Sequence, residues 1–453
     1  MASLQGFGGN CRSDGFLFHP TSTADLHEVA DLALQSGRKI ALRGSARSYG
    51  DPAQAAEAFV LDLSQWNQIL DWNPETGVLV AEPGVTLEQI WRLTLPDGYW
   101  PPVVSGTMRP TLAGALAMNI HGKNAADAGT LGEWVDRIDV WSPRGTHILL
   151  PDDPDFANVI SGAGLLGVIT QVTLRMKRVP SGEVDVKSLH AADWAGQFAA
   201  FAEEEGADYR VSWIDAFGQG RGHFHSAHYA EDGRKDRAQD LPSRILGLWP
   251  KAWVWPILRL LNTRGGMRSL NSVKALGAKF ADNKVHRQGL VEFQFLLDYV
   301  PNWQRAYGAD GLLQFQPFVP KDHAREVFQA LLADAADARM EPFLAVMKRH
   351  RADKLNWLFS YALDGYSLAL DFKVQPASGD QQKDLLRRMT ERVLDAGGRF
   401  YFAKDSVLSP SEVQRYLGEA TLARYHEAKT RLDPNGLFTS DLARRLGLEI
   451  RTP

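Results

Sequence analysis

Cysteine is the scarcest residue of this 453-residue sequence, which contains only Cys11. One thiol cannot form an internal disulfide framework, and it cannot build a zinc site made of cysteines. The scarcity of cysteine fits a reducing compartment. We therefore expect neither a disulfide-stabilised secreted fold nor a metal centre.

The sequence also lacks long apolar runs and an excess of charge of one sign. No run of about 18 apolar residues occurs, so no transmembrane helix is expected. The first residues, MASLQGFGGNCRSDGF, show no basic segment followed by an apolar one, so we expect no Sec-type signal peptide. The formal net charge of −4 offers no basic surplus for nucleic acid. These absences predict a cytoplasmic protein that does not bind nucleic acid.

The length favours two domains rather than one small core. Residues 20–180 alternate between helical and extended patterns, beginning with a helix that Gly37 ends. A strand at 39–42 follows, and Thr86 to Gln89 have the spacing of a capping box that opens a short helix. This part of the chain is predicted to be α+β with short connections.

Turn-forming residues at 179–183 indicate a boundary, and longer alternating strands follow it. In LLQFQPFVP (312–320), Leu313 and Phe315 alternate with Gln314 and Gln316, and in YSLALDFKV (366–374) the large apolar residues share one face, opposite a face made of Ser367, Ala369, Asp371 and Lys373. The pattern predicts a sheet with an apolar back, covered by helices such as 321–336, and a polar front. The polar front either binds a ligand or faces solvent.

The segment 241–280 is rich in tryptophan and cations. Its three tryptophans are interrupted by Pro250 and Pro256, so we expect neither one continuous helix nor a membrane span. Aromatic and basic residues around a short apolar stretch are typical of segments at a membrane interface. The alternative is a lid or core helix. The cations available for lipid or substrate phosphates are Arg244, Lys251, Arg259 and Arg264.

Three loops rich in glycine and small residues lie in the first part of the chain. They are RGSARSYGD (43–51), the stretch from Ser105 through TLAGALAM into NIHGKN (119–124), and SGAGLLG (161–167). Such loops present backbone N–H groups to anions. None is a GxGxxG sequence that opens a helix in a βαβ unit, so a nicotinamide site is poorly supported. Together the three loops favour a large cofactor that carries a pyrophosphate.

These loops, with SGAGLLGVITQVTL and the tail LDPNGLFTSDLARRL, resemble the vanillyl-alcohol-oxidase-type FAD flavoenzymes. The sequence looks most like the branch that oxidises decaprenylphosphoryl-ribose, and only the first twenty residues match poorly. The resemblance implies a two-domain α+β fold of the PCMH type. It places an FAD-binding domain at 1–180, a substrate domain at 181–396 with an interfacial insertion at about 241–280, and a return to the FAD-binding domain at 397–453.

The resemblance also implies roles for individual residues. FAD would be bound by Arg43, Gly44, Ser45, Ala46, Arg47, Ser48, Tyr49, Gly50, Gly106, Thr107, Thr111, Gly114, Ala115, Asn119, His121, Gly122, Lys123, Gly162, Gly164, Gly167, Val168, Ile169 and Tyr401. The substrate would be bound by Trp213, Tyr307, Gln314, Gln316, Lys348, Ser367, Tyr401 and Lys404.

Three positions depart from the family pattern. Arg47 stands where many relatives carry the histidine that anchors FAD covalently, so we expect non-covalent FAD. Ser367 and Ala369 stand where the ribose-oxidising branch has asparagine and cysteine. Loss of a carboxamide changes the hydrogen-bonding groups around the sugar, which leaves the exact substrate open.

Oxidation of a secondary alcohol by a flavin moves a hydride from carbon to flavin N5 and a proton from oxygen to a base. Lys404 and Lys123 are suited to stabilise negative charge on the reduced flavin. We assign the proton to His121, because the free imidazole pKa is near neutrality, about 6.5. A neutral Lys404 is the alternative base, since burial beside other cations lowers the pKa of a lysine.

The expected function is oxidation of the C2 hydroxyl of a polyprenyl-phospho-pentose in cell-wall biosynthesis. The membrane-bound substrate predicts a peripheral location at the inner membrane, through 241–280. The family suggests a short-chain reductase partner that completes an epimerisation. The alternatives are an FAD oxidase or dehydrogenase of a soluble sugar, alditol or aldonolactone, and a flavin-binding protein without turnover.

Overall fold

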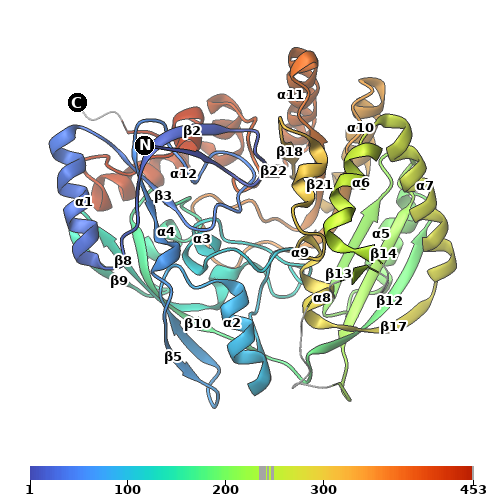
Figure 1. Ribbon diagram of the computed structural model, residues 1–453, viewed down its shortest axis with the longest axis horizontal. Helices are drawn as coiled ribbons and strands as arrows, with labels where there is room; N and C mark the ends of the chain where they lie inside the picture. Colours follow the sequence, from blue (N-terminus) through green and yellow to red (C-terminus); the bar gives the residue numbers. More distant parts are fainter. Residues whose placement is uncertain (234–240, 242–243, 246–248, 451–453) are drawn as a thin grey trace.

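Three β-sheets carry the fold, and two of them belong to the first 180 residues (Figure 1). The computed structural model describes residues 1–450 except 234–240, 242–243 and 246–248, and it describes no side chain for Ile245 or Trp249. The first sheet has the order β1-β2-β4-β3, in which β4 runs parallel to β2 and β3. Its strands are β1 (Ala2–Gln5), β2 (Arg12–Phe18), β3 (Ile40–Arg43) and β4 (Phe59–Asp62).

Helix α1 (Thr23–Ser36) links β2 to β3 and confirms the first predicted helix. Ser22 forms a capping box with Asp25 at its start, and Gly37 ends it in the left-handed conformation at φ 65°. Leu26, Val29, Ala30 and Ala33 are the buried residues of the helix. The predicted helical spacing therefore marks the face that packs onto the first sheet.

The second sheet is antiparallel, with the order β5-β6-β10-β8-β9. Its strands are β5 (Ile69–Asn73), β6 (Val78–Ala81), β8 (Val135–Ser142), β9 (Gly145–Leu149) and β10 (Val168–Arg175). Between β6 and β8 lie α2 (Leu87–Thr94) and the short α3 (Leu112–Ala117), and α4 (Pro154–Val159) precedes β10. The capping box predicted at Thr86 is present, and the chain leaves α2 through one 3₁₀ turn to Gly98.

The C-terminal segment packs back onto the first sheet. Ile40 of β3 donates its N–H to the Leu437 carbonyl, and the Thr439 N–H donates to the Ile40 carbonyl, each over 2.8 Å. Helix α12 (Pro410–Leu432) precedes this contact, and α13 (Asp441–Arg445) follows it. The first strands and helix α12 thus lie in the same half of the molecule (Figure 1).

The third sheet is antiparallel and holds the other half of the molecule. Its order is β17-β12-β14-β13-β20-β21-β19-β22, and β18 also pairs with β21. The strands are β12 (Glu183–Ala191), β13 (Tyr209–Ile214), β14 (Gly222–Tyr229), β17 (Lys284–Gly289), β18 (Leu312–Phe315), β19 (Pro317–Pro320), β20 (Leu344–His350), β21 (Gly365–Lys373) and β22 (Arg399–Phe400).

The strand predicted at 312–320 is divided into β18 and β19, although its register against β21 does not change. Phe315 stands opposite Leu370, and Phe318 stands opposite Ser367. Pro317 has no N–H to donate, so the ladder is interrupted there without a shift. Gln314 and Gln316 consequently stay on the same face of the sheet.

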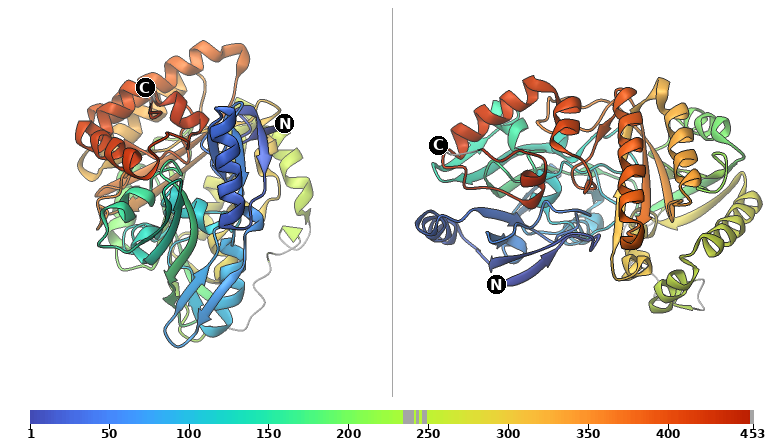
Figure 2. Two further views of the ribbon diagram at one scale, coloured as in Figure 1. Left: turned by 90° about the vertical axis from the view of Figure 1, so that its left-hand side faces the viewer. Right: turned by 90° about the horizontal axis from the view of Figure 1, so that it is seen from above.

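Helices cover the apolar back of this sheet, as the alternating pattern predicted. They are α5 (Trp194–Glu203), α10 (Lys321–Asp337) and α11 (Gly379–Asp395). On the back, the Phe224 ring of β14 packs edge-on against Phe201 of α5. Helix α7 (Arg264–Ala281) lies on the opposite, front face, over β12 and β14 (Figure 2, right).

The described part of 241–280 is not one continuous helix, as expected. The short strands β15 (Arg244–Ile245) and β16 (Trp249–Pro250) precede α6 (Val254–Leu261), and α7 follows. Pro256 does not break the segment, which corrects the expectation. It occupies the third position of α6, where a backbone N–H has no partner within the helix. The helical break falls instead between Leu261 and Arg264.

Among the described residues, no helix has both the length and the apolar character that a membrane span requires.

Candidate active site

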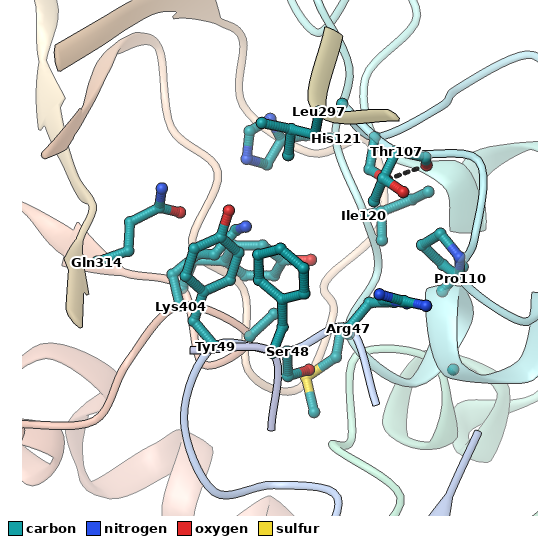
Figure 3. A pocket seen from close by; sticks show the side chains of 18 of the residues that line it. Arg47, Ser48, Tyr49, Thr107, Pro110, Ile120, His121, Leu297, Gln314 and Lys404 are labelled. Atoms are coloured by element: carbon teal, nitrogen blue, oxygen red, sulfur yellow. Dashed lines mark hydrogen bonds between the residues drawn. The ribbon is translucent and has the colours of Figure 1, made fainter. Parts of the chain in front are cut away.

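A cavity of about 620 Å³ separates the glycine-rich loops of the first half from the front of the third sheet. Figure 3 shows Arg47, Tyr49, His121, Gln314 and Lys404 around this space. Among the residues predicted to bind FAD, those that line it are Arg43, Gly44, Ser45, Ala46, Arg47, Ser48, Tyr49, Gly106, Thr107, Thr111, Gly114, Ala115, His121, Lys123, Gly164, Gly167, Ile169 and Tyr401. Among the predicted substrate residues, Trp213, Gln314, Gln316, Lys348, Ser367, Tyr401 and Lys404 line it.

Six of the predicted residues do not line the cavity, and several support its wall instead. Asn119 receives a hydrogen bond from the Gly132 N–H (2.8 Å) and donates one to Thr130 (3.0 Å). Tyr307 is fully buried, and its hydroxyl donates to Asp371 over 3.4 Å. The others are Gly50, Gly122, Gly162 and Val168. At Gly50 and Gly162, an added Cβ would lie within 2.4 Å of a backbone oxygen.

The loop after β3 fits a group that carries a diphosphate. Ala46 adopts a positive φ of 50°, and such a backbone turns successive N–H groups toward one side. A Cβ on Gly44 would lie 2.2 Å from Thr111 Oγ1, so only glycine allows the loop to approach the start of α3 this closely. Arg43 and Arg47 bring positive charge to the same loop, and the residues present therefore suit FAD.

A short segment from the second half closes over the cofactor loops. In α9 (Leu296–Tyr299), the Leu297 N–H donates to the Gly106 carbonyl over 3.0 Å. Asp298 accepts hydrogen bonds from the Thr107 hydroxyl (2.9 Å) and the Met108 N–H (2.7 Å). These contacts fix the 105–108 loop and place Leu297 on the cavity wall, which it shares with His121 (Figure 3).

His121 is buried at the junction of the two halves. Gln316 Nε2 lies within hydrogen-bond distance of His121 Nε2, at 3.1 Å. The ring packs edge-on against His350 and Tyr401, with centroids 4.9 and 5.5 Å away. Burial and the nearby Lys348 hold the pKa of His121 well below its ordinary value. The premise of a near-neutral imidazole pKa is therefore incorrect, and the proton role of His121 stays a prediction.

Lys404 offers a titrating group at neutral pH. Its Nζ lies 3.5 Å from the centroid of the Tyr49 ring. Burial lowers the pKa of Lys404 to about 7, with Asp371 opposing the shift and Lys348 adding to it. Burial likewise raises the pKa of Asp371, whose carboxylate accepts a hydrogen bond from Gln314. Lys404 thus meets the pKa requirement of a general base better than His121 does.

Lys123 and Lys348 contribute two further cations. Lys123 Nζ donates to the carbonyl oxygens of Phe293 and Gln294 and lies 4.1 Å from the Phe293 ring centroid. Lys348 projects from β20 onto the front of the sheet, where burial lowers its pKa to about 8. Ser367 lies opposite Lys348 on β21, and its hydroxyl is hydrogen-bonded to His350 Nε2 over 2.8 Å.

Several site residues escaped prediction from the sequence. The alternating pattern placed Asp371 on the polar front of the sheet. Its pairing with Gln314 could not be predicted, because it depends on the register between two distant strands. His350 ends β20, a strand that the sequence patterns did not predict, and its contact with His121 is long-range. His225 and Lys274 also line the cavity. Lys274 falls in the tryptophan-rich segment, where composition suggested a membrane role instead.

The described residues contain no cluster of His, Cys, Asp and Glu that could hold a metal ion.

Comparisons with known proteins identify the family of the chain. Residues 15–150 match the FAD binding domain family. Decaprenylphosphoryl-beta-D-ribose oxidase of Mycolicibacterium smegmatis is 30% identical over 455 residues, which cover 94% of each chain. An uncharacterised protein of Streptomyces coelicolor is 28% identical over 382 residues, 80% of this chain and 100% of that protein. L-gulono-1,4-lactone dehydrogenase of Mycobacterium tuberculosis is 23% identical over 457 residues, 95% of each chain.

The similarity to the first relative spans nearly the whole of both chains, and the FAD-binding match falls on the half that carries the glycine-rich loops. The fold is α+β, with mixed and antiparallel sheets, as the family predicts. The chain belongs to the vanillyl-alcohol-oxidase-type family of FAD-dependent oxidoreductases, as a relative of decaprenylphosphoryl-β-D-ribose oxidase.

Proposed function

We propose that this protein oxidises the C2 hydroxyl of a polyprenyl-phospho-pentose, such as decaprenylphosphoryl-ribose, to the keto sugar, with FAD bound non-covalently. One observation carries the proposal. The cavity joins a polar, cation-rich region on the front of the third sheet to an apolar region beneath α6. A sugar phosphate attached to an isoprenoid chain has the same division into polar and apolar parts. The relative from Mycolicibacterium smegmatis supports the same choice.

The polar region suits a sugar ring. Gln314, Gln316 and Ser367 present amide and hydroxyl groups to the cavity, and Trp213 forms an apolar wall. FAD, when bound, supplies the acceptor for the hydride that leaves the sugar carbon. Lys404 would remove the hydroxyl proton, because the ammonium pKa is lowered to about 7. Positively charged Lys348 would stabilise negative charge that develops on the sugar oxygen.

The apolar region suits the isoprenoid chain. It is lined by Leu258 of α6, by Leu296, Leu297 and Val300 around α9, and by Trp303 and Phe343. Pockets of this kind take up flexible apolar ligands through buried contact area rather than directed hydrogen bonds. Because α6 forms part of the wall, the chain would leave the cavity beside the tryptophan-rich segment.

The outer faces of α6 and α7 suit contact with a lipid bilayer. Trp253, Ile257 and Leu260 follow one helical stripe and are 64, 45 and 80% exposed. On α7, Val273, Leu276 and Phe280 form a second exposed stripe. Exposed apolar faces flanked by cations are typical of helices that lie in a membrane interface. We propose that this surface, the α6–α7 face, docks on the membrane that holds the substrate.

One of the four cations expected to meet phosphates is already engaged. Arg264 forms a two-point ion pair with Glu341, with the closest contact at 2.6 Å, so its charge is balanced within the protein. Lys251 lies 5.0 Å from the Tyr299 ring centroid and faces the molecule. Arg244 and Arg259 are exposed and remain candidates for lipid headgroups.

A soluble sugar or aldonolactone is the second candidate substrate. The L-gulono-1,4-lactone dehydrogenase relative and the altered positions Ser367 and Ala369 favour it. The keto sugar of the first candidate is an intermediate that a reductase would convert to the epimer, so a short-chain reductase partner belongs to that proposal. A non-catalytic flavin-binding role would leave the cation set of the cavity without a purpose.

Dye-coupled oxidation by the purified FAD protein distinguishes these candidates. Polyprenyl-phospho-pentoses, free pentoses, alditols and aldonolactones should be compared at matched concentrations. We expect the lipid-linked pentose to give a kcat/KM at least 100-fold above any soluble substrate, because the apolar region and the cations then act together. A higher kcat/KM for a lactone or free sugar would contradict the proposal. Absence of flavin bleaching with every substrate would favour the non-catalytic role.

A further inference from the structure

Helix α7 brings a lysine to the front of the third sheet. Met267, Asn271, Ala275 and Ala278 are the buried residues of α7, and Asn271 donates to Asp215 over 3.0 Å at the end of β13. Lys274 lies on this inner side and lines the cavity. Its Nζ is 4.2 Å from the centroid of the Trp213 ring. The helix that offers an apolar face to solvent therefore also delivers a cation to the site.

The cavity has far more basic than acidic side chains. Its described lining contains six basic side chains, Arg43, Arg47, Lys123, Lys274, Lys348 and Lys404, against one carboxylate, Asp371. Asp371 lies beside Lys404 and bonds to Gln314. In the part of the chain that the structure describes, no carboxylate pairs with Lys274, and its side chain is accessible while it lines the cavity beside Trp213. An accessible ammonium without a carboxylate partner, in a cavity with this excess of basic side chains, can bind an anionic ligand.

FAD does not supply that anion. Its diphosphate is predicted at the 43–51 loop, whereas Lys274 stands over β13 and β14. His225 also lines the cavity, and burial, then His223, Lys123 and Lys274, lower its pKa to about 3. The His225 ring is therefore neutral, and Ser188 occupies its Nδ1 side at 3.2 Å. A neutral imidazole beside an ammonium can complete the binding of an oxyanion.

The spacing of the strands suits a phosphate attached to the sugar. Ala369, Val346 and Trp213 stand opposite one another across β21, β20 and β13. Because neighbouring strands are about 5 Å apart, Trp213 lies roughly 10 Å from β21. A sugar ring over β21 and β20, near Ser367 and Lys348, would then direct its next substituent over β13 toward Lys274.

We propose that Lys274, assisted by His225, binds the phosphate of the substrate, a sugar phosphodiester whose lipid chain leaves beneath α6. This inference rests on the proposed function, because it assigns the charged part of that substrate. Lys274 thereby becomes a specificity-determining residue that favours phosphorylated substrates over neutral sugars and lactones. Its place on α7 connects substrate selection to the same helix that faces the membrane.

Calorimetric titration of the FAD-loaded, full-length protein tests the subsite without turnover. The probes are farnesyl phosphate, farnesol and inorganic phosphate. Wild-type protein should bind farnesyl phosphate at least about tenfold more tightly than farnesol, as expected for a charge-assisted hydrogen bond. Lys274→Met, which keeps the alkyl stem on Trp213, should abolish this preference without changing farnesol affinity. Lys274→Arg should retain most of it.

Lys279→Met is the matched control, since Lys279 is an exposed residue of α7 that does not line the cavity. It should behave as wild type. The proposal is overturned if wild-type protein shows no preference for the phosphate, or if Lys274→Met keeps the wild-type preference. Inorganic phosphate binding as tightly as farnesyl phosphate would overturn the assignment to a lipid-linked group.

The subsite and the proposed function can fail separately. If Lys274→Met oxidises a polyprenyl-phospho-pentose with wild-type KM, the subsite is refuted and the function stands. If wild-type protein prefers a lactone in turnover while farnesyl phosphate binding still depends on Lys274, the function is refuted and the anion subsite stands.

Discussion

The Lys404 ammonium lies over the ring of Tyr49, with Nζ 3.5 Å from the ring centroid. Tyr49 belongs to the glycine-rich loop after β3, and Lys404 follows β22 at the edge of the third sheet. The Tyr49 N–H also donates to the Ala403 carbonyl over 2.8 Å. The cofactor loop and the proposed base are therefore fixed to one another, so any movement of one displaces the other.

Replacing Lys404 should change the dependence of turnover on pH. Burial lowers the pKa of Lys404 to about 7, and a base acts in its deprotonated form. In wild-type protein, kcat should therefore rise as pH increases through about 7 and then level off. Lys404→Met should lower kcat by about 10²- to 10⁴-fold and remove this rise.

To test this, kcat of wild-type protein and Lys404→Met is measured by dye reduction at saturating substrate over a range of pH. Lys373→Met is the matched control, because Lys373 is exposed at the end of β21 and does not line the cavity. If Lys404→Met still shows the wild-type rise, another group is the base.

Replacing His121 should leave the cofactor in place and reduce turnover. His121→Ala removes a ring that is held between Gln316, His350 and Tyr401, so the sugar pocket loses one side. We expect an unchanged flavin absorbance spectrum and a kcat lowered by about 100-fold. The rise of kcat with pH should persist in this variant. If it disappears in His121→Ala and persists in Lys404→Met, the imidazole is the base.

The sequence patterns predicted those features that depend on nearby residues. The cap and stop of α1, the front and back faces of β21 and the glycine-rich loops all follow from local spacing. The electrostatic surroundings of individual side chains could not be predicted from local spacing, because they depend on residues that are distant in the sequence. The lowered pKa of His121 arises mainly from its burial between the two halves, and then from Lys348 on a distant strand. The ion pair of Arg264 with Glu341 likewise requires the folded contact.

FAD should be released from the protein by acid. Arg47 lies in the cavity wall where many relatives have the anchoring histidine, and a guanidinium does not form the covalent link. Precipitation with acid should leave all flavin absorbance in the supernatant, and gel electrophoresis of the pellet should show no flavin fluorescence. Flavin that remains with the denatured pellet would contradict non-covalent binding.

Charges on the α6–α7 face should abolish membrane association. Leu260 and Phe280 are 80 and 70% exposed, so Leu260→Glu with Phe280→Glu should not disturb the fold. Each carboxylate opposes insertion of its helix among acyl chains and repels anionic lipids. We expect at least a tenfold loss of cosedimentation with vesicles that contain anionic lipid, at unchanged FAD content.

Ile148→Glu is the matched control for this surface. Ile148 is 56% exposed on β9, in the other half of the molecule. Its vesicle binding should equal that of wild type. Equal binding by the double variant and wild type would show that the α6–α7 face is not the membrane contact.

A methyl group at Gly50 should separate the cofactor loop from the proposed base. The added Cβ would lie 2.1 Å from the carbonyl oxygen of Asp405 and 3.2 Å from Ser406 Cβ, and a backbone oxygen cannot rotate away. The 43–51 loop must then shift relative to Lys404, which breaks the stacking on Tyr49. Gly50→Ala should lower the free energy of unfolding by about 1–3 kcal/mol, the usual cost of overpacking, as measured by urea titration.

Gly50→Ala should also lower kcat more than the control variant Gly206→Ala, because an added Cβ at Gly206 meets no heavy atom within 4 Å. If Gly50→Ala has wild-type stability and kcat, the close approach of Gly50 to Asp405 does not fix the position of the 43–51 loop relative to Lys404.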